Sequence, residues 1–236
     1  MLSSERNFLM RINKLFSNYG ICSRKETNKF IEDNRVIING KLATKGQWVE
    51  ESDNILLDNK PLKKREKIYI ALNKPTGITT TLARDVKDNI LDFMNYKEYI
   101  FPVGRLDKES QGLIIMTNDG DLANKILKSE NNHEKEYIVT VDKPFNDEFI
   151  EKMSKGVYIL NTKTKPCKVT RINEDTFNII LTQGLNKQIR RMSKALGYKV
   201  IYLKRIRIMN INIDGILKGE FRNLTEEEVE ELKNYK

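Results

Sequence analysis

A carboxylate stands among cations in residues 104–112, GRLDKESQG, which lie between two apolar, strand-like segments. Asp107 has Arg105 two residues before it and Lys108 directly after it. The simplest interpretation of this stretch alone is a solvated turn. The alternative is a functional site that uses the carboxylate, and the rest of the chain has to decide between the two.

The remaining composition argues against several other chemistries. His133 is the only histidine and lies in the polar stretch SENNHEKEY, where we expect an ordinary surface residue. A Ser-His-Asp triad would depend on this residue alone, and a zinc site needs clustered Cys and His ligands. The phosphate-binding patterns GxxxxGK(S/T) and GxGxxG are absent from the sequence. An enzyme with this sequence would therefore rely on carboxylate, tyrosine and arginine side chains, with no metal and no cofactor.

The overall charge and the hydropathy pattern indicate the partner and the compartment. The formal charge of the 236 residues is +9, which favours a polyanionic partner, because cationic surfaces attract phosphate backbones. Cys22 and Cys167 are the only cysteines, and their number and separation predict reduced thiols. No apolar run approaches the roughly 18 residues of a membrane span, and residues 1–10 lack a signal-peptide pattern. We expect a cytoplasmic monomer that does not bind membranes.

Residues 1–66 predict a small domain of two helices and a hairpin sheet. Apolar residues at helical spacing in 11–19 indicate the first helix. Ser23 and Glu26 form the capping box of a second helix, which carries basic residues on its outer side. Asn39-Gly40 lies between two β-type segments and is a strong hairpin signal. The charged stretch PLKKREK then predicts a linker.

Residues 67–236 predict a second, larger domain in which strands come in consecutive sets rather than in strict alternation with helices. This order indicates an α+β domain with a mixed, largely antiparallel sheet. Strands are expected within 67–78, 99–104, 113–120, 135–144, 167–172, 177–184 and 200–213. Helices are expected within 88–95, 121–128, 146–156, 186–197 and 225–235, with Asp88 as the cap of the first.

A basic stretch without acidic residues lies between Asp175 and Asp214. A solvated face is the usual explanation of such a run. Here the run follows a second basic segment in the first domain, and its cations have no counter-charge in the sequence around them, so RNA is favoured as the partner. The cations of this stretch are Lys187, Arg190, Arg191, Lys194, Lys199, Lys204, Arg205 and Arg207.

The order of helix, capped basic helix and VIINGK hairpin resembles the small RNA-binding domain named after ribosomal protein S-four. The resemblance covers about residues 9–66. In that domain the basic helix pair docks on RNA, so the resemblance implies RNA contacts here. The residues in matching positions are Arg11, Lys14, Arg24, Lys25 and Lys29.

The second domain resembles the bacterial rRNA pseudouridine synthases of the RsuA branch, on the segments ALNKPTGI, GRLDKESQGLIIMTNDGDL and EKEYIVTV with GLNKQIRRM. With the first domain included, the resemblance covers nearly the whole chain. HEKEYIVTVDKP, GLNKQIRRM and RIRIMNINIDGI are most similar to the F-type members, which modify 23S rRNA. Leu185 stands where many relatives have a basic residue, which supports this subgroup, and Ser110 stands where many have threonine. F-type enzymes are also associated with a tRNA anticodon site, so a second substrate stays open.

The resemblance implies roles for individual residues in converting uridine to pseudouridine. Asp107 matches the nucleophile, and the sequence does not distinguish attack on the base, attack on the sugar carbon and removal of the 2′ proton. Arg105 is expected to fill the space left by the flipped base or to hold its phosphate; the alternative is a simple ion pair with Asp107. Tyr137 matches a tyrosine that stacks on uracil and takes part in late proton transfer. Arg190 matches the basic residue that pairs with the catalytic carboxylate. Lys187 and Arg191 are expected to contact RNA.

Two classes of function agree with these features. The first is an RNA isomerase that flips its target uridine in 23S rRNA or a large-subunit precursor. The second is an RNA-binding assembly factor that keeps the fold without catalysis. A factor that only binds RNA would be free to lose Asp107, Tyr137 and Arg190, and all of them are present. The isomerase is therefore the favoured hypothesis, and the target uridine cannot be inferred from the sequence.

Overall fold

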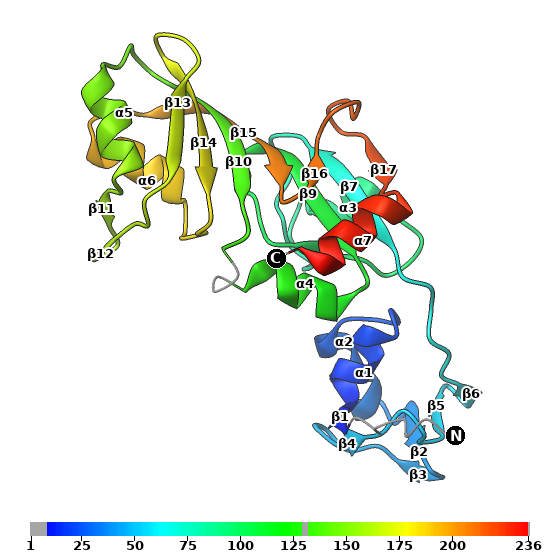
Figure 1. Ribbon diagram of the computed structural model, residues 1–236. Helices are drawn as coiled ribbons and strands as arrows, with labels where there is room; N and C mark the ends of the chain where they lie inside the picture. The colour runs from blue at the N-terminus through cyan, green and yellow to red at the C-terminus, as the bar shows by residue number, and fades with distance from the viewer. Residues whose placement is uncertain (1–8, 129–131, 236) are drawn as a thin grey trace, which may run out of the picture. The chain divides into compact units, whose positions relative to one another are not determined.

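The computed structural model describes residues 9–128 and 132–235, and the chain divides into two compact units. The first unit extends to Ile68 and includes the short segments Lys97–Ile100 and Asn118–Asp121. The second contains the remaining residues from Tyr69 onward. Figure 1 shows the helices and strands with the labels used below. No helix in the described residues is long and apolar enough to span a membrane.

The first unit packs two helices and short strands around an apolar core that includes Ile12, Phe16 and Val36. Its helices are α1 (Ile12–Asn18) and α2 (Arg24–Glu32). Its strands are β1 (Met10–Arg11), β2 (Val36–Ile38), β3 (Lys41–Leu42), β4 (Trp48–Val49), β5 (Ile55–Leu57) and β6 (Lys60–Pro61). β3, β2, β5 and β6 form an antiparallel sheet in that order, and β1 pairs with β4.

Two local sequence signals in the first unit are confirmed. Ser23 and Glu26 form the predicted capping box, in which each side chain accepts a hydrogen bond from the backbone N–H of the other residue, at 3.2 and 2.9 Å. Asn39 and Gly40 both have left-handed φ angles, 50° and 81°, and close the predicted hairpin between β2 and β3.

A nine-stranded mixed sheet forms the centre of the second unit. Its strands are β7 (Tyr69–Lys74), β8 (Phe101–Val103), β9 (Gln111–Thr117), β10 (Lys135–Val141), β13 (Lys168–Arg171), β14 (Thr176–Leu181), β15 (Val200–Ile208), β16 (Ile211–Asn212) and β17 (Phe221–Asn223). The order is β13-β14-β10-β15-β9-β7-β17, with β16 beside β15 and β8 beside β9. β15 and β9 are parallel and the other neighbours antiparallel, so the predicted α+β architecture with a mixed sheet is confirmed.

Several helices beyond the linker begin after a residue whose side chain caps them. The helices beyond the linker are α3 (Ile90–Met94), α4 (Gly120–Leu127), α5 (Asp147–Ser154), α6 (Gln188–Ala195) and α7 (Glu226–Asn234). Asn146 caps α5, and Thr225 with Glu228 forms the capping box of α7. A short hairpin that the sequence did not predict, β11 (Tyr158–Ile159) with β12 (Thr162–Lys163), follows α5.

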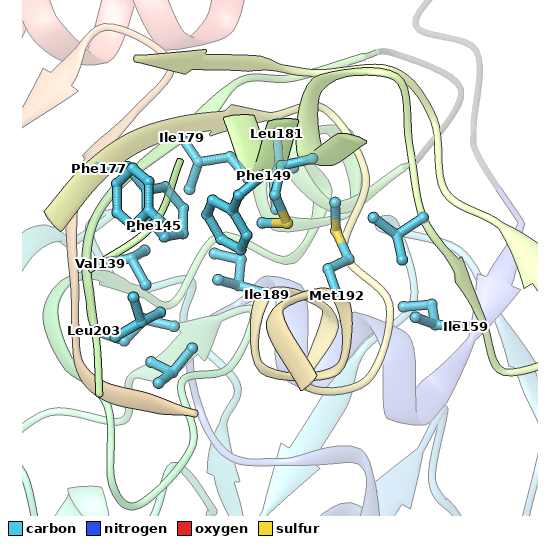
Figure 2. Close-up of a cluster of buried hydrophobic side chains, with 14 residues drawn as sticks. Val139, Phe145, Phe149, Ile159, Phe177, Ile179, Leu181, Ile189, Met192 and Leu203 are labelled. Atoms are coloured by element: carbon cyan, nitrogen blue, oxygen red, sulfur yellow. The ribbon is translucent and has the colours of Figure 1, made fainter. Parts of the chain in front are cut away.

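Apolar side chains from β10, β14, β15, α5 and α6 form one core of the second unit (Figure 2). The rings of Phe145, Phe149 and Phe177 pack with their centroids within 5.7 Å of one another. Ile189 and Met192, on the buried side of α6, are 5% and 0% exposed. This packing holds α6 against the sheet. A second core joins β7, β9, β16, α4 and α7.

The structure corrects two predicted elements. Asn89, not Asp88, caps α3, because its side-chain oxygen accepts from the N–H of Asp92 at 2.9 Å. Asp88 has a left-handed φ of 57°, whereas a capping residue needs an extended backbone. The predicted strand 200–213 turns back on itself at Met209, whose φ is 53°, and β16 pairs with β15. Apolar residues alternate with polar ones on both sides of Met209, so the pattern does not reveal the turn.

His133 is buried, so the prediction of a surface residue was wrong. Its side chain is 2% exposed, and its Nδ1 lies 3.1 Å from the carbonyl oxygen of Ile126. Its ring contacts Tyr235 edge to face, with the centroids 5.8 Å apart. Tyr235 directly follows α7. The polar residues around His133 in the sequence do not indicate this distant contact.

Candidate active site

Asp107 lies on the loop between β8 and β9, and the segment after β7 holds the backbone of this loop. The hydroxyl of Thr80 donates to the carbonyl oxygen of Leu106 at 2.8 Å. The N–H of Gly77 donates to the carbonyl oxygen of Lys108, also at 2.8 Å. These bonds fix the backbone on both sides of Asp107. Its half-buried side chain is therefore presented from a braced turn.

A cavity of about 520 Å³ in the second unit brings the predicted catalytic residues together. Asp107, Arg105, Tyr137, Arg190 and Lys187 all line it. Asp107 is the only carboxylate among the described residues of the lining. The other charged lining residues are Lys128, Lys135 and Arg205. A cavity with several cations and one carboxylate suits a ligand that carries negative charge.

Tyr137 reaches the cavity from β10. It stands opposite Ile179 of β14 on one side and Arg205 of β15 on the other. A shift in the β10–β15 register between Glu136 and Tyr137 marks a local irregularity, and irregularities of this kind redirect side chains. The half-buried ring of Tyr137 is available for stacking, and an aromatic ring can stack on any base.

Arg190 reaches the cavity from α6 and contacts the Asp107 loop through Ser110. Its Nη2 donates to the hydroxyl of Ser110 at 3.2 Å, and its Nη1 donates to the carbonyl oxygen of Val200 at 3.1 Å. Its Nε is buried, and no group in the described part of the chain forms a hydrogen bond with it. Of the ion pairs between described residues, none joins Arg190 to Asp107, and the expected pairing of these residues stays a prediction.

Arg105 and Lys108 flank Asp107, and both are exposed. Lys108 forms an ion pair with Asp88 at 3.4 Å, so its charge is engaged outside the cavity. Arg105 lines the cavity, and no ion pair between described residues joins it to Asp107. Its exposed guanidinium is therefore placed to meet a ligand that enters from solvent.

Lys187 and Arg191 lie at the start of α6. Lys187 has a left-handed φ of 49°, and its Nζ is 3.8 Å from the carboxylate of Glu109. Arg191 is exposed and donates to the backbone and side-chain oxygens of Asn186, at 3.0 and 3.1 Å. Both side chains reach solvent, which is compatible with the predicted RNA contacts.

The five cations predicted to bind RNA near the N-terminus all belong to the first unit. The guanidinium of Arg11 lies over the ring of Trp48, 4.5 Å from its centroid. Lys14 forms an ion pair with Asp121 at 3.8 Å. The remaining three are exposed side chains of α2: Arg24, Lys25 and Lys29.

Some cations of the basic stretch are paired with acidic residues from outside it. Arg207 forms ion pairs with Glu134 and Glu136, at 2.8 and 2.7 Å. Lys187 is paired with Glu109, as described above. These acids come from other strands and loops, which is why the local sequence lacks them.

Lys135 and Arg205 line the cavity although the sequence alone did not single them out as site residues. Arg205 is 3% exposed, whereas the basic run suggested a surface cation. Strand alternation is the signal that could have identified it, because Leu203 and Arg205 occupy the same, buried face of β15. Lys135 stands two residues before Tyr137 and therefore on the same face of β10.

Known proteins resemble this chain over most of its length. Residues 68–195 match a family described as RNA pseudouridylate synthase. The chain is 51% identical over 226 residues to the dual-specificity RNA pseudouridine synthase RluF of Escherichia coli strain K12, covering 94% of this chain and 78% of that protein. It is 32% identical over 232 residues to the ribosomal large subunit pseudouridine synthase B of Bacillus subtilis strain 168, covering 94% and 95%. A crystal structure of a pseudouridylate synthase superposes with a TM-score of 0.70 at 28% identity, covering 94% of this chain and 99% of that one.

Proposed function

Because the chain belongs to the RNA pseudouridine synthases, which convert uridine in RNA to pseudouridine, we propose that Asp107 is the nucleophile of this reaction. The observation that carries the proposal is the position of Asp107 as the one carboxylate among the described residues of the cavity lining. The reaction breaks the bond between N1 of the base and C1′ of the ribose and rejoins the rotated uracil through C5. Covalent catalysis by a carboxylate divides this difficult exchange into easier steps.

Asp107 can start the exchange by three routes. These routes are addition to the base, attack on C1′ of the sugar, and removal of the 2′ proton. The loop geometry is compatible with each route, because the carboxylate is half-buried and its backbone is braced on both sides.

The other cavity residues have complementary roles in this proposal. Tyr137 stacks on the flipped uracil, and its hydroxyl takes part in the late proton transfer. Arg105 fills the space that the base leaves or holds the phosphate of the flipped nucleotide, which offsets part of the cost of flipping. Arg190 orients the Asp107 loop and balances the charge of the carboxylate. No step requires a metal or a cofactor.

The substrate of this enzyme is 23S rRNA or a large-subunit precursor. A relative at 32% identity is a ribosomal large subunit pseudouridine synthase, which supports this choice. The relative at 51% identity is a dual-specificity enzyme, which supports a second RNA substrate, here a tRNA anticodon uridine.

The first unit serves as an RNA-binding domain of the S-four type. The support for this role is the order of α1, the capped basic helix α2 and the β2–β3 hairpin. Arg24, Lys25 and Lys29 are exposed on α2, where they can meet phosphates. This domain would position the catalytic unit on its RNA in the cytoplasm, with the protein acting as a monomer.

Tritium release from RNA that contains uridine labelled at C5 tests the proposed reaction, because the C5 hydrogen is lost when C5 bonds to the sugar. We expect release from 23S rRNA transcripts with the purified protein alone. RNA binding without release would instead indicate a non-catalytic assembly factor. Pseudouridine mapping of rRNA and tRNA with and without the gene then identifies the target uridines.

A further inference from the structure

Arg205 lies in the wall of the cavity, between the strand that leads from the Asp107 loop and the strand that carries Tyr137. It belongs to β15 and stands opposite Tyr137 on β10 and opposite Gly112 on β9. Its Nε donates to the carbonyl oxygen of Leu113 on β9 at 2.6 Å. Residues directly opposite on neighbouring strands project to the same face, so Arg205 and Tyr137 reach the cavity side by side.

The backbone around Arg205 permits little movement. A Cβ atom added to Gly112 would lie 2.2 Å from the carbonyl oxygen of Arg205, so only glycine allows β9 and β15 to approach this closely. The side chain of Arg205 is 3% exposed. Its guanidinium is therefore held in a fixed place next to the site of the reaction.

The charge of Arg205 has no carboxylate partner among the ion pairs of the described residues. Its Nη2 is buried and has no hydrogen-bond partner among the residues that the structure describes. Arg207, two residues along the same strand, shows the usual arrangement, with ion pairs to Glu134 and Glu136. An uncompensated buried cation destabilises a fold, and an apolar residue of similar volume would pack at lower cost. Stability of the fold therefore does not explain why a charged residue occupies this position.

The charge of Arg205 acts on two lysines, of which Lys135 lines the cavity. Burial, followed by the charge of Arg205, lowers the pKa of Lys135 to about 8. The same two causes lower the pKa of Lys74 to about 8, while Asp107 acts on Lys74 in the opposite direction. Arg205 and Asp107 thus influence the same buried region.

We propose that Arg205 stabilises the negative charge that the uracil acquires when it is detached from the ribose. This role rests on the proposed pseudouridine synthase function. When the N1–C1′ bond breaks, its electron pair stays with N1, and the base carries one negative charge until C5 bonds to C1′. The C5 proton is then lost, and N1 takes up a proton. A fixed cation at the cavity wall stabilises this charge without having to reorganise, and in a site shielded from water its effect is larger than in solution.

Three substitutions separate the charge of Arg205 from its hydrogen bond. In Arg205→Gln the side-chain nitrogen occupies the position of Nε, so the bond to Leu113 can persist while the charge is lost. Arg205→Met removes both, and Arg205→Lys keeps a charge. We expect the single-turnover rate of N1–C1′ cleavage to fall by about 100-fold for Gln and Met, as for the loss of one preorganised charge-stabilising group, with Lys clearly faster than Gln. A Gln variant within about tenfold of the wild-type rate, or equal rates for Lys and Gln, would overturn the proposal.

A second substrate distinguishes this role from a purely structural one. Fluorine at C5 withdraws electrons, so 5-fluorouridine needs less stabilisation of its detached base. We expect the ratio of 5-fluorouridine to uridine cleavage rates to be larger for Arg205→Gln than for the wild-type protein and for the control Arg207→Gln. The folded fraction of each preparation cancels in this ratio. If the wild-type protein is active and the ratios are equal, only the role of Arg205 is contradicted. If the wild-type protein does not cleave the bond, the proposed function is contradicted as well.

Discussion

The guanidinium of Arg190 and the hydroxyl of Ser110 are joined by a hydrogen bond of 3.2 Å, which connects α6 to the loop that carries Asp107. A second bond, of 3.1 Å, runs from the same guanidinium to the carbonyl oxygen of Val200, the first residue of β15. Ser110 is 2% exposed, so water has little access to this hydrogen bond. Arg190 is therefore oriented by contacts that do not include Asp107.

Replacing Ser110 by alanine should slow catalysis without weakening RNA binding. The substitution leaves one guanidinium N–H of Arg190 without an acceptor in a buried place. Because hydrogen bonds to charged groups contribute roughly 1.5–3 kcal/mol, we expect the single-turnover rate of pseudouridine formation to fall by about tenfold or more. Ser110→Thr keeps the hydroxyl and should retain most of the rate.

Ser193→Ala is the matched control for Ser110→Ala. Ser193 is a fully buried serine of α6, and its hydroxyl has no hydrogen-bond partner within residues 9–128 and 132–235. Its removal should leave both the rate and the RNA affinity unchanged. An equal loss of rate in the two alanine variants would show that the Arg190–Ser110 bond has no specific role.

Asp107→Asn should abolish turnover and leave the RNA affinity within a few-fold of the wild-type value. The carboxylate contributes to the chemistry, whereas phosphate contacts supply most of the binding. The control is Glu109→Gln, which neutralises the exposed carboxylate two residues along the same loop and should retain turnover. Pseudouridine formation by the purified Asp107→Asn variant would contradict the assignment of Asp107 as the nucleophile.

Local sequence signals predicted the fold better than they predicted the cavity wall. The capping box at Ser23, the turn at Asn39-Gly40 and the Asp107 loop depend on neighbouring residues, so they can be recognised from short stretches. Arg205 appears in the sequence as one of several cations in a basic run. Its burial depends on β9 and β10, which lie far away in the chain, and charged residues are rarely buried. The pairing of Arg207 with Glu134 and Glu136 is non-local for the same reason.

Glu228→Gln should destabilise the protein near neutral pH and have little effect in acid. The two nitrogens of the Arg222 guanidinium bond both carboxylate oxygens of Glu228 at 2.7 Å, and this pairing lowers the pKa of Glu228 below its ordinary 4.5. Above pH 4.5 the carboxylate is ionised in the folded and the unfolded chain, so the stabilisation is fully present. It is lost as the pH falls through the lowered pKa.

Urea unfolding at several pH values measures this effect. Glutamine still supplies the oxygen that accepts from the N–H of Thr225, so the variant keeps the capping box but loses the charge and one of the two hydrogen bonds from Arg222. We expect a deficit of up to about 1 kcal/mol at pH 7 that shrinks below pH 4. Glu227→Gln, on the exposed side of the same helical turn, is the control. A deficit that does not depend on pH would contradict the attributed cause.

Activity should persist in EDTA without any added cofactor. In the described residues, no group of three or more His, Cys, Asp or Glu side chains is arranged to hold a metal ion. The assay uses a short RNA hairpin that folds without magnesium, so that chelation does not act through the RNA. Loss of turnover on dialysis against EDTA, with recovery on adding zinc or magnesium, would contradict the metal-free mechanism.

Replacing Lys25 and Lys29 together by glutamine should weaken RNA binding and make the affinity less dependent on the salt concentration. Both side chains are exposed on α2, where each can contact one phosphate. Each lost contact lowers the slope of log affinity against log salt by roughly 0.7–0.9, so the double substitution should flatten the slope by about 1.4–1.8. The control pair is Lys152 of α5 and Lys155, which directly follows α5; both are exposed but paired with Glu148 and Glu151. Filter binding at several salt concentrations measures both slopes. If the α2 pair and the α5 pair change the slope equally, the first unit has no special role in RNA recognition, and the cations of the second unit provide the binding.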